Sequence, residues 1–418
     1  MEEQSIQKTI IVTIARSQRD MSDAEIGLDE LTRLVETAGG EVVARVIQLK
    51  TALDPRTCIG AGKVQEIKEL GTNLSAELVV FDFELTPSQI RNLEDDFDGM
   101  EVIDRTILIL DIFAKHAVTG EGKLQVELAQ LKYTVPRLVG RGKALSRLGG
   151  GIGTRGPGES KLESDRRHVH ERICALERQL KELESTRKTM RAARDRSGIR
   201  KVALVGYTNA GKSTLMNALT DAGVLAENKL FATLDPTTRR LALQNGEEIL
   251  ITDTVGFIRN LPHHLVHAFR STLDEVVYAD IILLVSDVTD PETEAHIAVT
   301  EELLGELGAS DKPILYVYNQ CDKLSDFPEI GLKKANNKIY ISAEKRYGLN
   351  LLLDSLVQLL DDGKERHALL IPYDCLSRVS ALHCDATVEE EIYSEEGVRI
   401  TATLDKKSVG KYAEYIVQ

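Results

Sequence analysis

The sequence predicts an α/β protein of several domains, in which mostly parallel sheets are covered by helices. The chain has 418 residues, which is more than one hydrophobic core usually organises. Stretches rich in Val and Ile alternate with helix-like stretches over much of its length. One region differs, because leucines recur there at coiled-coil intervals. We expect four units, which cover residues 1–120, 121–196, 198–363 and 366–418.

The first unit, residues 1–120, is expected to be a small α/β domain. Its helices should lie at 23–40 and 61–73, each ending at Gly or Asn as helices often do. Its strands should be the apolar stretches TIIVTIA, EVVARVIQL, ELVVFDF and MEVIDRTILIL. The run TILIL at 106–110 is thus expected to be a buried strand, like IILLV at 281–285, because neither run is long enough to span a membrane.

The second unit, residues 121–196, is expected to be an antiparallel helical hairpin. Apolar residues recur at intervals of three, four or seven on both sides of a glycine-rich stretch, which predicts two helices that pack on each other. The two stripes consist of Leu124, Leu128, Leu131 and Val135, and of Leu162, Val169, Ile173, Leu176, Leu180, Leu183 and Met190. Residues 137–160 would then form the tip of the hairpin.

The tip contains Gly151, Gly153 and Gly156, which match the G-x-G-x-x-G pattern of dinucleotide-binding loops. Such a loop follows a strand, whereas helical and then basic sequence precedes these glycines, so we reject that interpretation. Residues 132–201 hold nineteen Lys or Arg against eight Asp or Glu, although the whole chain carries a net charge of −14. This asymmetry predicts an RNA-binding element on an acidic body, with a flexible solvated loop as the alternative. The candidate RNA contacts are Arg141, Lys143, Arg147 and Arg155.

The third unit begins with GYTNAGKS at 206–213, which fits the phosphate-binding pattern G-x-x-x-x-G-K-S directly after the apolar strand VALV. Gly206 and Gly211 allow the tight turn whose N–H groups surround phosphates. Lys212 would reach the β- and γ-phosphates, and Ser213 would ligate Mg²⁺. This predicts a P-loop domain of the Ras-like type, with helices on both faces of a mostly parallel sheet.

A second apolar strand ends at DTVG, residues 253–256, which is typical of a Walker B and switch II segment. Asp253 would hold the hydration shell of Mg²⁺, and the Gly256 N–H would contact the γ-phosphate. Between the two motifs, a switch I threonine is needed to sense the γ-phosphate and Mg²⁺. Three threonines are chemically suitable, namely Thr233, Thr237 and Thr238.

Two further strand ends carry residues that suit a guanine base. Asp322, within NQCD at 319–322, can accept hydrogen bonds from the guanine N1–H and 2-amino groups, which adenine does not offer there. The stretch SAE at 342–344 follows the next strand, where a backbone N–H can meet guanine O6. Four motifs in this order predict a GTPase in which positioning does most of the catalytic work.

Three residues suggest how this GTPase differs from others. Gln320 replaces the lysine that usually covers the base, so some nucleotide affinity is expected to be lost. Phe257 follows DTVG, where many GTPases have a glutamine that orients water, so intrinsic hydrolysis should be slow and stimulated by a partner or an ion. Asn209 resembles the asparagine that helps to hold K⁺ in cation-activated GTPases, which makes K⁺ dependence a hypothesis.

The fourth unit, residues 366–418, is expected to be a small α+β domain without catalytic residues. Its order should be strand, helix, strand, strand and helix, with a hairpin around SEEG. One face of the hairpin should carry Val398, Ile400, Ala402 and Leu404. The five cysteines of the chain form no C-x-x-C pair and the first residues form no apolar leader, so we expect reduced thiols and a cytoplasmic, monomeric protein.

The chain resembles the HflX family of ribosome-associated GTPases. Besides the motifs above, the resemblance lies in segments such as VVFDFELTPSQIRNLE, GKLQVELAQLKYTVPRL, LSRLGGGIGTRGPGES and LFATLDPTTRR. It implies GTP-dependent binding to the large (50S) ribosomal subunit and splitting or rescue of stalled ribosomes. It also implies that Thr233 is the switch I ligand of Mg²⁺ and that the glycine-rich tip reaches toward the peptidyl-transferase region.

The expected nucleotide site combines these motifs. Catalytic roles fall to Lys212, Thr233 and Gly256, and the Mg²⁺ ligands are Ser213, Thr233 and, indirectly, Asp253. The residues expected to bind GTP are Gly206, Tyr207, Thr208, Asn209, Ala210, Gly211, Lys212, Ser213, Thr214, Phe231, Ala232, Thr233, Leu234, Asp235, Asp253, Thr254, Val255, Gly256, Asn319, Gln320, Cys321, Asp322, Ser342, Ala343 and Glu344.

Two other classes of function stay open at this point. In a GTP-gated binding module, a non-hydrolysable GTP analogue would suffice for the biological effect. A GTPase of RNA modification or ribosome assembly would prefer assembly intermediates to mature ribosomes. The absence of an extra Cys/His/Asp cluster in the sequence argues against modification chemistry.

Overall fold

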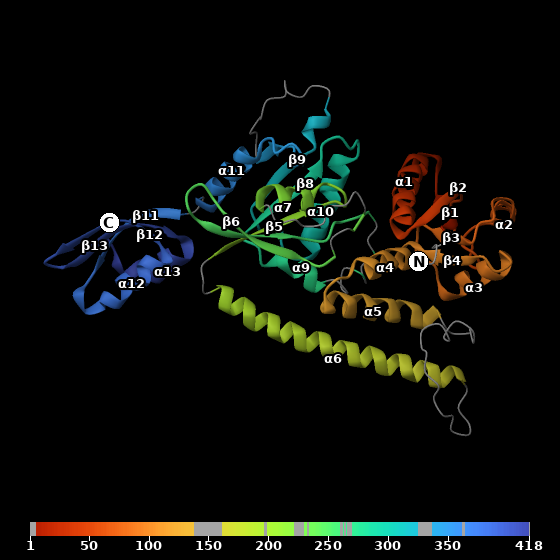
Figure 1. Ribbon diagram of the computed structural model, residues 1–418, viewed down its shortest axis with the longest axis horizontal. Helices are drawn as coiled ribbons and strands as arrows, with labels where there is room; N and C mark the ends of the chain where they lie inside the picture. Colours follow the sequence, from red (N-terminus) through yellow and green to blue (C-terminus); the bar gives the residue numbers. More distant parts are fainter. Residues whose placement is uncertain are drawn as a thin grey trace.

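The computed structural model of the protein describes residues 6–137, 161–195, 199–220, 230–231, 234–259, 262, 265, 270–324, 337–361 and 364–417. Three separate sheets divide the chain into an N-terminal, a central and a C-terminal part, and a pair of helices lies along one side (Figure 1). None of the helices in the described part of the chain is long and apolar enough to cross a membrane.

The N-terminal sheet has four parallel strands in the order β2-β1-β3-β4. They are β1 (Gln7–Ala15), β2 (Gly40–Leu49), β3 (Leu78–Phe81) and β4 (Glu101–Asp104). The helices α1 (Met21–Ala38) and α4 (Arg105–His116) pack on one face, and α2 (Ala61–Leu74) and α3 (Pro87–Asp96) pack on the other. The expected α/β fold of this region is confirmed.

The expectation of a strand at TILIL was wrong, because residues 106–110 lie in α4. The Asp104 side chain ends β4 and caps α4, since its Oδ1 accepts a hydrogen bond of 3.1 Å from the Ile107 N–H. The helix is apolar on several sides because it packs between the sheet and the following helix, α5 (Gly120–Thr134). A short apolar run of this kind does not distinguish a buried helix from a buried strand.

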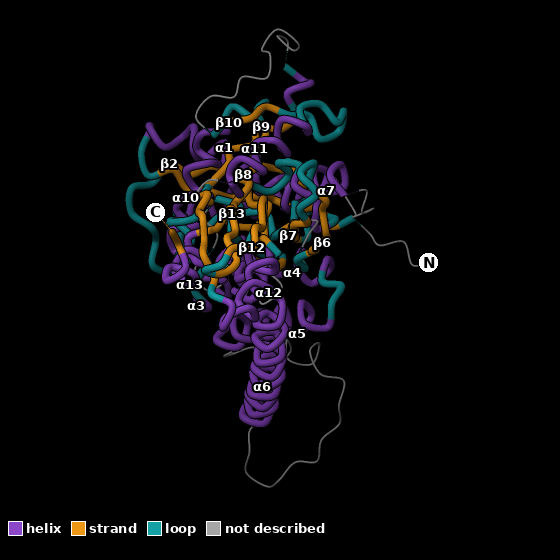
Figure 2. The backbone as a smooth tube through the Cα atoms, turned by 90° about the vertical axis from the view of Figure 1, so that its left-hand side faces the viewer, coloured by secondary structure: helices purple, strands orange, loops and turns teal. Residues whose placement is uncertain are grey.

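The helices α5 and α6 (Lys161–Asp195) form the predicted hairpin. Leu131, Ile173 and Leu176 make a buried cluster between them, which Leu124, Leu128, Val135 and Val169 extend. Arg172 makes a bidentate ion pair with Glu127, at 2.7 Å for each bond. Leu183 is 36% exposed, so the packed stripe does not extend to it. Figure 2 shows α6 projecting from the body of the molecule.

The central sheet has six strands in the order β10-β9-β8-β5-β7-β6. They are β5 (Arg200–Gly206), β6 (Thr237–Ala242), β7 (Glu248–Asp253), β8 (Ile281–Asp287), β9 (Ile314–Asn319) and β10 (Lys338–Tyr340). All pairs are parallel except β6 with β7. α7 (Lys212–Thr220) and α11 (Leu349–Asp361) cover one face, and α9 (Arg270–Val277) and α10 (Thr293–Glu306) cover the other. This is the predicted Ras-like arrangement.

The C-terminal part has an antiparallel sheet in the order β12-β13-β11-β14. Its elements are β11 (Lys364–Ile371), α12 (Leu376–Asp385), β12 (Thr387–Ser394), β13 (Gly397–Asp405), α13 (Lys406–Tyr412) and β14 (Ile416–Val417). The alternating residues Val398, Ile400, Ala402 and Leu404 lie on one face of the sheet, as predicted, and all four are fully buried. Figure 1 places this part at the opposite end from the N-terminal sheet.

Candidate nucleotide-binding site

The carboxyl ends of three strands meet at one edge of the central sheet. β5 ends at Gly206, β7 at Asp253 and β9 at Asn319. Because the strands are parallel, their carboxyl ends lie on the same side, where open α/β sheets usually bind ligands. The loop between β5 and α7 is the predicted P-loop.

The P-loop needs glycine at both ends. Gly206 has φ of 152°, and a Cβ atom there would lie 2.0 Å from the carbonyl oxygen of Val285. Gly211 has φ of 88°, and a Cβ atom there would lie 2.2 Å from Nδ2 of Asn319. Both positions combine a left-handed backbone with a close approach, which only glycine permits without strain.

Lys212 begins α7 and directs its ammonium group back into the P-loop. Its Nζ donates hydrogen bonds to the carbonyl oxygens of Gly206 at 3.1 Å and Tyr207 at 2.8 Å. Burial lowers the pKa of Lys212 to about 8, while the carboxylate of Asp253 acts in the opposite direction. A buried cation whose nearest partners are backbone carbonyls is suited to bind a phosphate, which would supply negative charge.

Two oxygen atoms beside Lys212 suit a metal ion. The Ser213 hydroxyl donates a hydrogen bond of 2.6 Å to Oδ2 of Asp253. Hydroxyl and carboxylate oxygens are the donors that Mg²⁺ prefers, usually together with several waters. The donor set therefore fits a hydrated Mg²⁺ ion next to the P-loop.

The segment that follows β7 runs alongside the P-loop. The Thr208 N–H donates to the Phe257 carbonyl oxygen at 2.8 Å, and the Phe257 N–H donates to the Gly206 carbonyl oxygen at 3.1 Å. A Cβ atom on Gly256 would lie 3.0 Å from Nζ of Lys212, so the structure brings these two residues together. The Phe257 ring is fully buried in the core against α9 and α10, so it is not available to orient water.

Asn319 connects three of the predicted motifs. Its Nδ2 donates to the Ala210 carbonyl oxygen at 3.0 Å, and its Oδ1 accepts a hydrogen bond of 3.0 Å from the Ala343 N–H. The side chain is buried at the end of β9. Its amide therefore holds the P-loop and the SAE stretch at fixed positions on either side of it.

The other base-recognition residues surround this amide. Gln320 adopts φ of 64°, and its Nε2 lies 3.5 Å from the Asn209 carbonyl oxygen. Cys321 is buried, Asp322 is half-buried and Glu344 is exposed. A carboxylate at Asp322 that is still partly open to solvent can receive a base from outside.

The described part of switch I packs on the N-terminal helices. Phe231 contacts the Phe113 ring edge to face, with the centroids 4.7 Å apart, and Leu234 joins the same core. Asp235 accepts hydrogen bonds at the start of α5. Of the three candidate threonines, Thr237 and Thr238 begin β6. Ala232 and Thr233 lie outside the described residues, as do the four candidate RNA contacts, Arg141, Lys143, Arg147 and Arg155.

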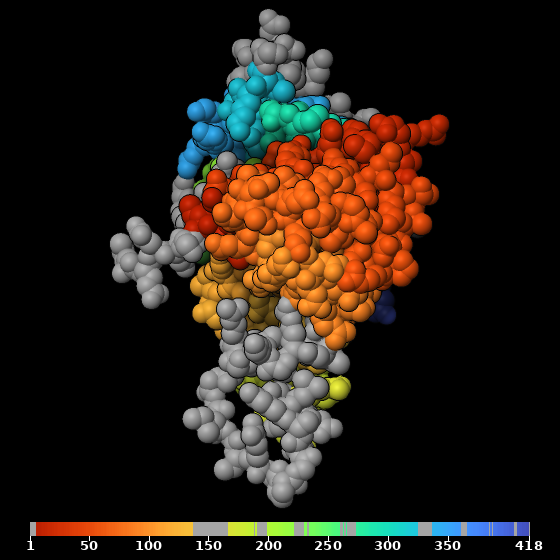
Figure 3. Space-filling model, turned by 90° about the vertical axis from the view of Figure 1, so that its right-hand side faces the viewer, coloured from red at the N-terminus to blue at the C-terminus, as the bar shows by residue number. Residues whose placement is uncertain are grey.

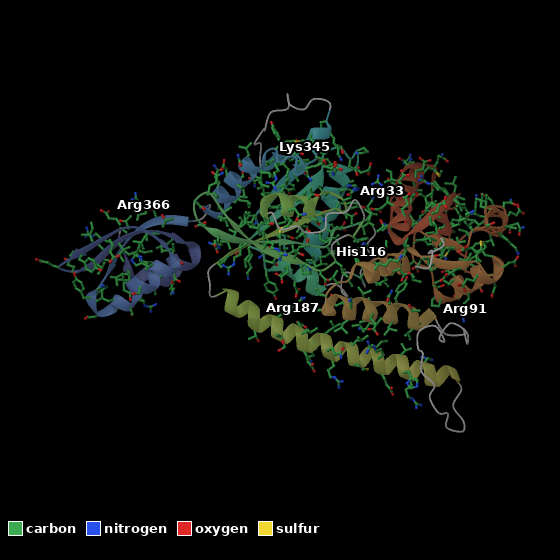
Figure 4. The ribbon with its side chains drawn as sticks, in the orientation of Figure 1. Arg33, Arg91, His116, Arg187, Lys345 and Arg366 are labelled. Atoms are coloured by element: carbon green, nitrogen blue, oxygen red, sulfur yellow. The ribbon has the colours of Figure 1, made fainter. Side chains whose placement is uncertain are left out.

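Residues of the N-terminal helices also reach the P-loop, since the Tyr207 hydroxyl donates a hydrogen bond to Glu30 of α1. A cavity of about 760 Å³ lies between α1 and the P-loop, and Glu30, Arg33, Tyr207 and Asn209 are among its lining residues. Figure 4 shows Arg33 on the side of α1 that faces the central part. Figure 3 views the same end of the molecule, where the N-terminal part covers much of the central part. No sequence motif marks Glu30 or Arg33, because the contacts join segments far apart in the chain.

Known proteins with similar sequences are GTPases, in agreement with a nucleotide-binding site at the P-loop. Three family models match the chain: "GTP-binding GTPase N-terminal" at residues 25–114, "GTP-binding GTPase Middle Region" at 116–194 and "50S ribosome-binding GTPase" at 201–320. The GTPase HflX of Caldanaerobacter subterraneus subsp. tengcongensis is 49% identical over 98% of this chain and 94% of that protein. The chain belongs to the GTPase HflX family.

Other HflX proteins and solved structures are also similar. The GTPase HflX of Escherichia coli is 42% identical over 94% of this chain and 92% of that protein. A crystal structure of a GTP-binding protein from the archaeon Sulfolobus solfataricus in complex with GDP is 28% identical, with a TM-score of 0.44, over 84% of this chain and 98% of that chain. Family membership and the P-loop fold make this HflX protein a GTP-binding, GTP-hydrolysing enzyme.

Proposed function

We propose that this HflX protein binds the large (50S) ribosomal subunit and dissociates or rescues stalled ribosomes in a manner that depends on its bound nucleotide. The observation that supports this most directly is the match of the central part to the family model described as 50S ribosome-binding GTPase. The basic character of the hairpin supports the same proposal, because α6 exposes cations such as Arg166, Arg178 and Lys181, which suit an RNA partner.

Hydrolysis would depend on groups that the P-loop places around the phosphates. Lys212 and the P-loop amides would stabilise the negative charge that develops on the transferred phosphoryl group. The Gly256 N–H would contact the γ-phosphate, and its proximity to Lys212 supports this role. No described side chain near Lys212 is a convincing general base, so positioning of GTP and water is the principal contribution of the protein.

Mg²⁺ is the proposed cofactor, and when bound it would neutralise charge on the β- and γ-phosphates. Ser213 would hold it directly, and Asp253 would hold it through water, in agreement with the 2.6 Å contact between their oxygens. Thr233 is proposed as the further ligand from switch I. At the other end of the site, Asp322 would select guanine. The Ala343 N–H, which donates to Asn319 Oδ1 at 3.0 Å, would then lie near guanine O6.

We further propose four domains. Residues 1–120 would form an N-terminal α/β domain, residues 121–196 the helical hairpin, residues 198–363 the GTPase domain and residues 366–418 a small α+β domain. The hairpin tip at 137–160 would approach ribosomal RNA. The protein would act as a monomer in the cytoplasm.

Sedimentation of mature 70S ribosomes on sucrose gradients tests the proposed function. We expect free subunits when the protein is added with GTP, and intact ribosomes with GDP. Free subunits with a non-hydrolysable analogue as well would show that GTP binding is sufficient and that hydrolysis only resets the protein. Ribosomes that stay intact in every nucleotide state would contradict splitting. Tighter binding to precursor subunits than to mature ones would indicate a role in ribosome assembly instead.

A further inference from the structure

The hydroxyl of Thr208 in the P-loop is buried without a hydrogen-bond partner. Thr208 is 7% exposed, and no donor or acceptor in the described part of the chain pairs with its Oγ1. Buried polar atoms are nearly always paired, so an unpaired one beside a binding site points to a group that arrives with the ligand. The unpaired hydroxyl also costs free energy in the nucleotide-free protein, which such a group would recover.

The other hydroxyls of the P-loop and of the segment after β7 already have partners. Residues 206–213 and 254–259, all of which the structure describes, carry three of them besides that of Thr208. They are Tyr207, which accepts from the Arg259 N–H at 2.7 Å, Ser213, which donates to Asp253 at 2.6 Å, and Thr254, which donates to the Leu204 carbonyl oxygen at 2.7 Å. In these two segments, the Thr208 hydroxyl is thus the one that is left to meet a ligand.

The Thr208 side chain lies where the γ-phosphate is expected. A Cβ atom on Gly256 would lie 2.9 Å from Cγ2 of Thr208 and 3.0 Å from Nζ of Lys212, so the three residues meet at one point. The Thr208 N–H donates to the Phe257 carbonyl oxygen at 2.8 Å, which joins the two segments at this point. Because Lys212 and the Gly256 N–H are the proposed contacts of the γ-phosphate, Thr208 borders the same group.

A group that orients the attacking water is required at this place. Phe257 occupies the position at which many GTPases have a glutamine for this purpose, and its ring is fully buried against α9 and α10. The water must be aligned with the γ-phosphorus, opposite the bridging oxygen that leaves with GDP. A hydroxyl suits this task because its oxygen accepts hydrogen bonds while its proton is donated elsewhere.

We propose that Thr208 is a further catalytic residue, whose hydroxyl accepts a hydrogen bond from the attacking water and aligns it with the γ-phosphate. This inference rests on the proposed contact between the Gly256 N–H and the γ-phosphate. The water oxygen forms a bond to the γ-phosphorus while the bond from that phosphorus to the bridging oxygen breaks, and GDP leaves with that oxygen. The proton that the water releases goes to the phosphate product, so Thr208 itself is unchanged.

The variant Thr208→Val tests this role at nearly constant shape, because a methyl group replaces the hydroxyl. We expect kcat to fall about tenfold, the rate change that corresponds to one hydrogen bond. The affinity for GDP, which lacks a γ-phosphate, should stay nearly unchanged. Thr208→Ser keeps the hydroxyl and should keep most of the kcat. Hydrolysis is measured on the full chain without ribosomes, so the result does not depend on ribosome splitting.

Thr106→Val is a matched control. Thr106 on α4 is fully buried, its hydroxyl likewise has no partner among the described residues, and it lies outside the nucleotide site. This variant should keep the kcat of the unmodified protein. In both valine variants the midpoint of urea denaturation without nucleotide should stay the same or rise, because an unpaired buried hydroxyl is removed. Loss of a hydroxyl with a structural role would lower the midpoint instead.

Three outcomes would overturn the inference. They are an unchanged or higher kcat in Thr208→Val, an equal loss in Thr208→Val and Thr106→Val, and a loss in Thr208→Ser as large as that in Thr208→Val. The placement of the γ-phosphate is checked separately with Gly256→Ala, whose Cβ would crowd Thr208 and Lys212. Normal hydrolysis by Gly256→Ala would contradict this placement, and the role of Thr208 would fail with it. Impaired hydrolysis by Gly256→Ala beside normal hydrolysis by Thr208→Val would contradict the role of Thr208 alone.

Discussion

The Asp235 carboxylate of switch I binds the N-terminus of α5 through Thr119. Its Oδ2 accepts hydrogen bonds from the Thr119 N–H at 2.8 Å and the Val118 N–H at 3.0 Å, and its Oδ1 accepts one of 2.5 Å from the Thr119 hydroxyl. A negative charge at a helix N-terminus is favourable because the first backbone N–H groups have no partner within the helix. The segment that would sense GTP is thus attached to the helical hairpin that would contact the ribosome.

This contact should stabilise the folded protein. Asp235→Ala removes the acceptor of three hydrogen bonds, so we expect the free energy of unfolding to fall by about 2 kcal/mol. Thr86→Ala serves as the control, because the exposed Thr86 hydroxyl caps α3 through contacts with Ser88 and Gln89 only, far from switch I. Denaturation in urea measures the free energy of unfolding of both variants. A smaller loss for Asp235→Ala than for Thr86→Ala would contradict the prediction.

Burial of Lys212 should make the stability of the nucleotide-free protein depend on pH. The pKa of Lys212 falls to about 8 in the folded state, so the unfolded chain binds more protons between pH 8 and the ordinary lysine value. The contribution of Lys212 to the free energy of unfolding therefore increases with pH in that window, and below pH 8 the buried charge is destabilising.

Lys212→Met tests this pH dependence directly. At pH 7 it should raise the free energy of unfolding of the nucleotide-free protein by about 2 kcal/mol, and the gain should shrink as the pH approaches 10. The same variant should lose GTP hydrolysis, because the charge that faces the phosphates is gone. A gain in stability that is the same at pH 7 and pH 9.5 would show that Lys212 does not titrate in this window.

Selection of guanine should depend on the carboxylate of Asp322. In Asp322→Asn the side chain offers an N–H where the guanine base also offers N–H groups, so GTP affinity should fall by about a hundredfold. Xanthosine triphosphate has a carbonyl oxygen in place of the 2-amino group, and its affinity should increase. Competition binding with both nucleotides provides the measurement. An equal loss of affinity for GTP and for xanthosine triphosphate would contradict this role and would indicate a structural one for Asp322.

The hypothesis of K⁺ activation concerns Asn209, which has φ of 63° in the P-loop. If its side chain helps to hold K⁺ near the phosphates, hydrolysis should be faster in KCl than in NaCl. Asn209→Ala should remove the difference without a large change in the rate in NaCl. Equal rates in KCl and NaCl for the unmodified protein would contradict the hypothesis.

The G motifs could be predicted because each is a short local pattern at the end of a strand. The P-loop glycines, Lys212 and Asn319 lie where such patterns require them. Residues 106–110 were wrongly predicted to form a strand, and the cause is physical. The helix α4 is covered on several sides, so its apolar residues show no clear helical period. The approach of Glu30 and Arg33 to the P-loop could not be predicted, because long-range contacts leave no local pattern.

We propose that the nucleotide controls binding to the large ribosomal subunit through the basic hairpin. Co-sedimentation with purified large subunits under GDP, GTP and a non-hydrolysable GTP analogue measures this control. The variant with Arg141, Lys143, Arg147 and Arg155 changed to Ala is measured in parallel. We predict binding that is stronger in the GTP forms and weakened in the variant. Equal binding in every nucleotide state would contradict the control by nucleotide, and full binding by the variant would contradict the role of the tip.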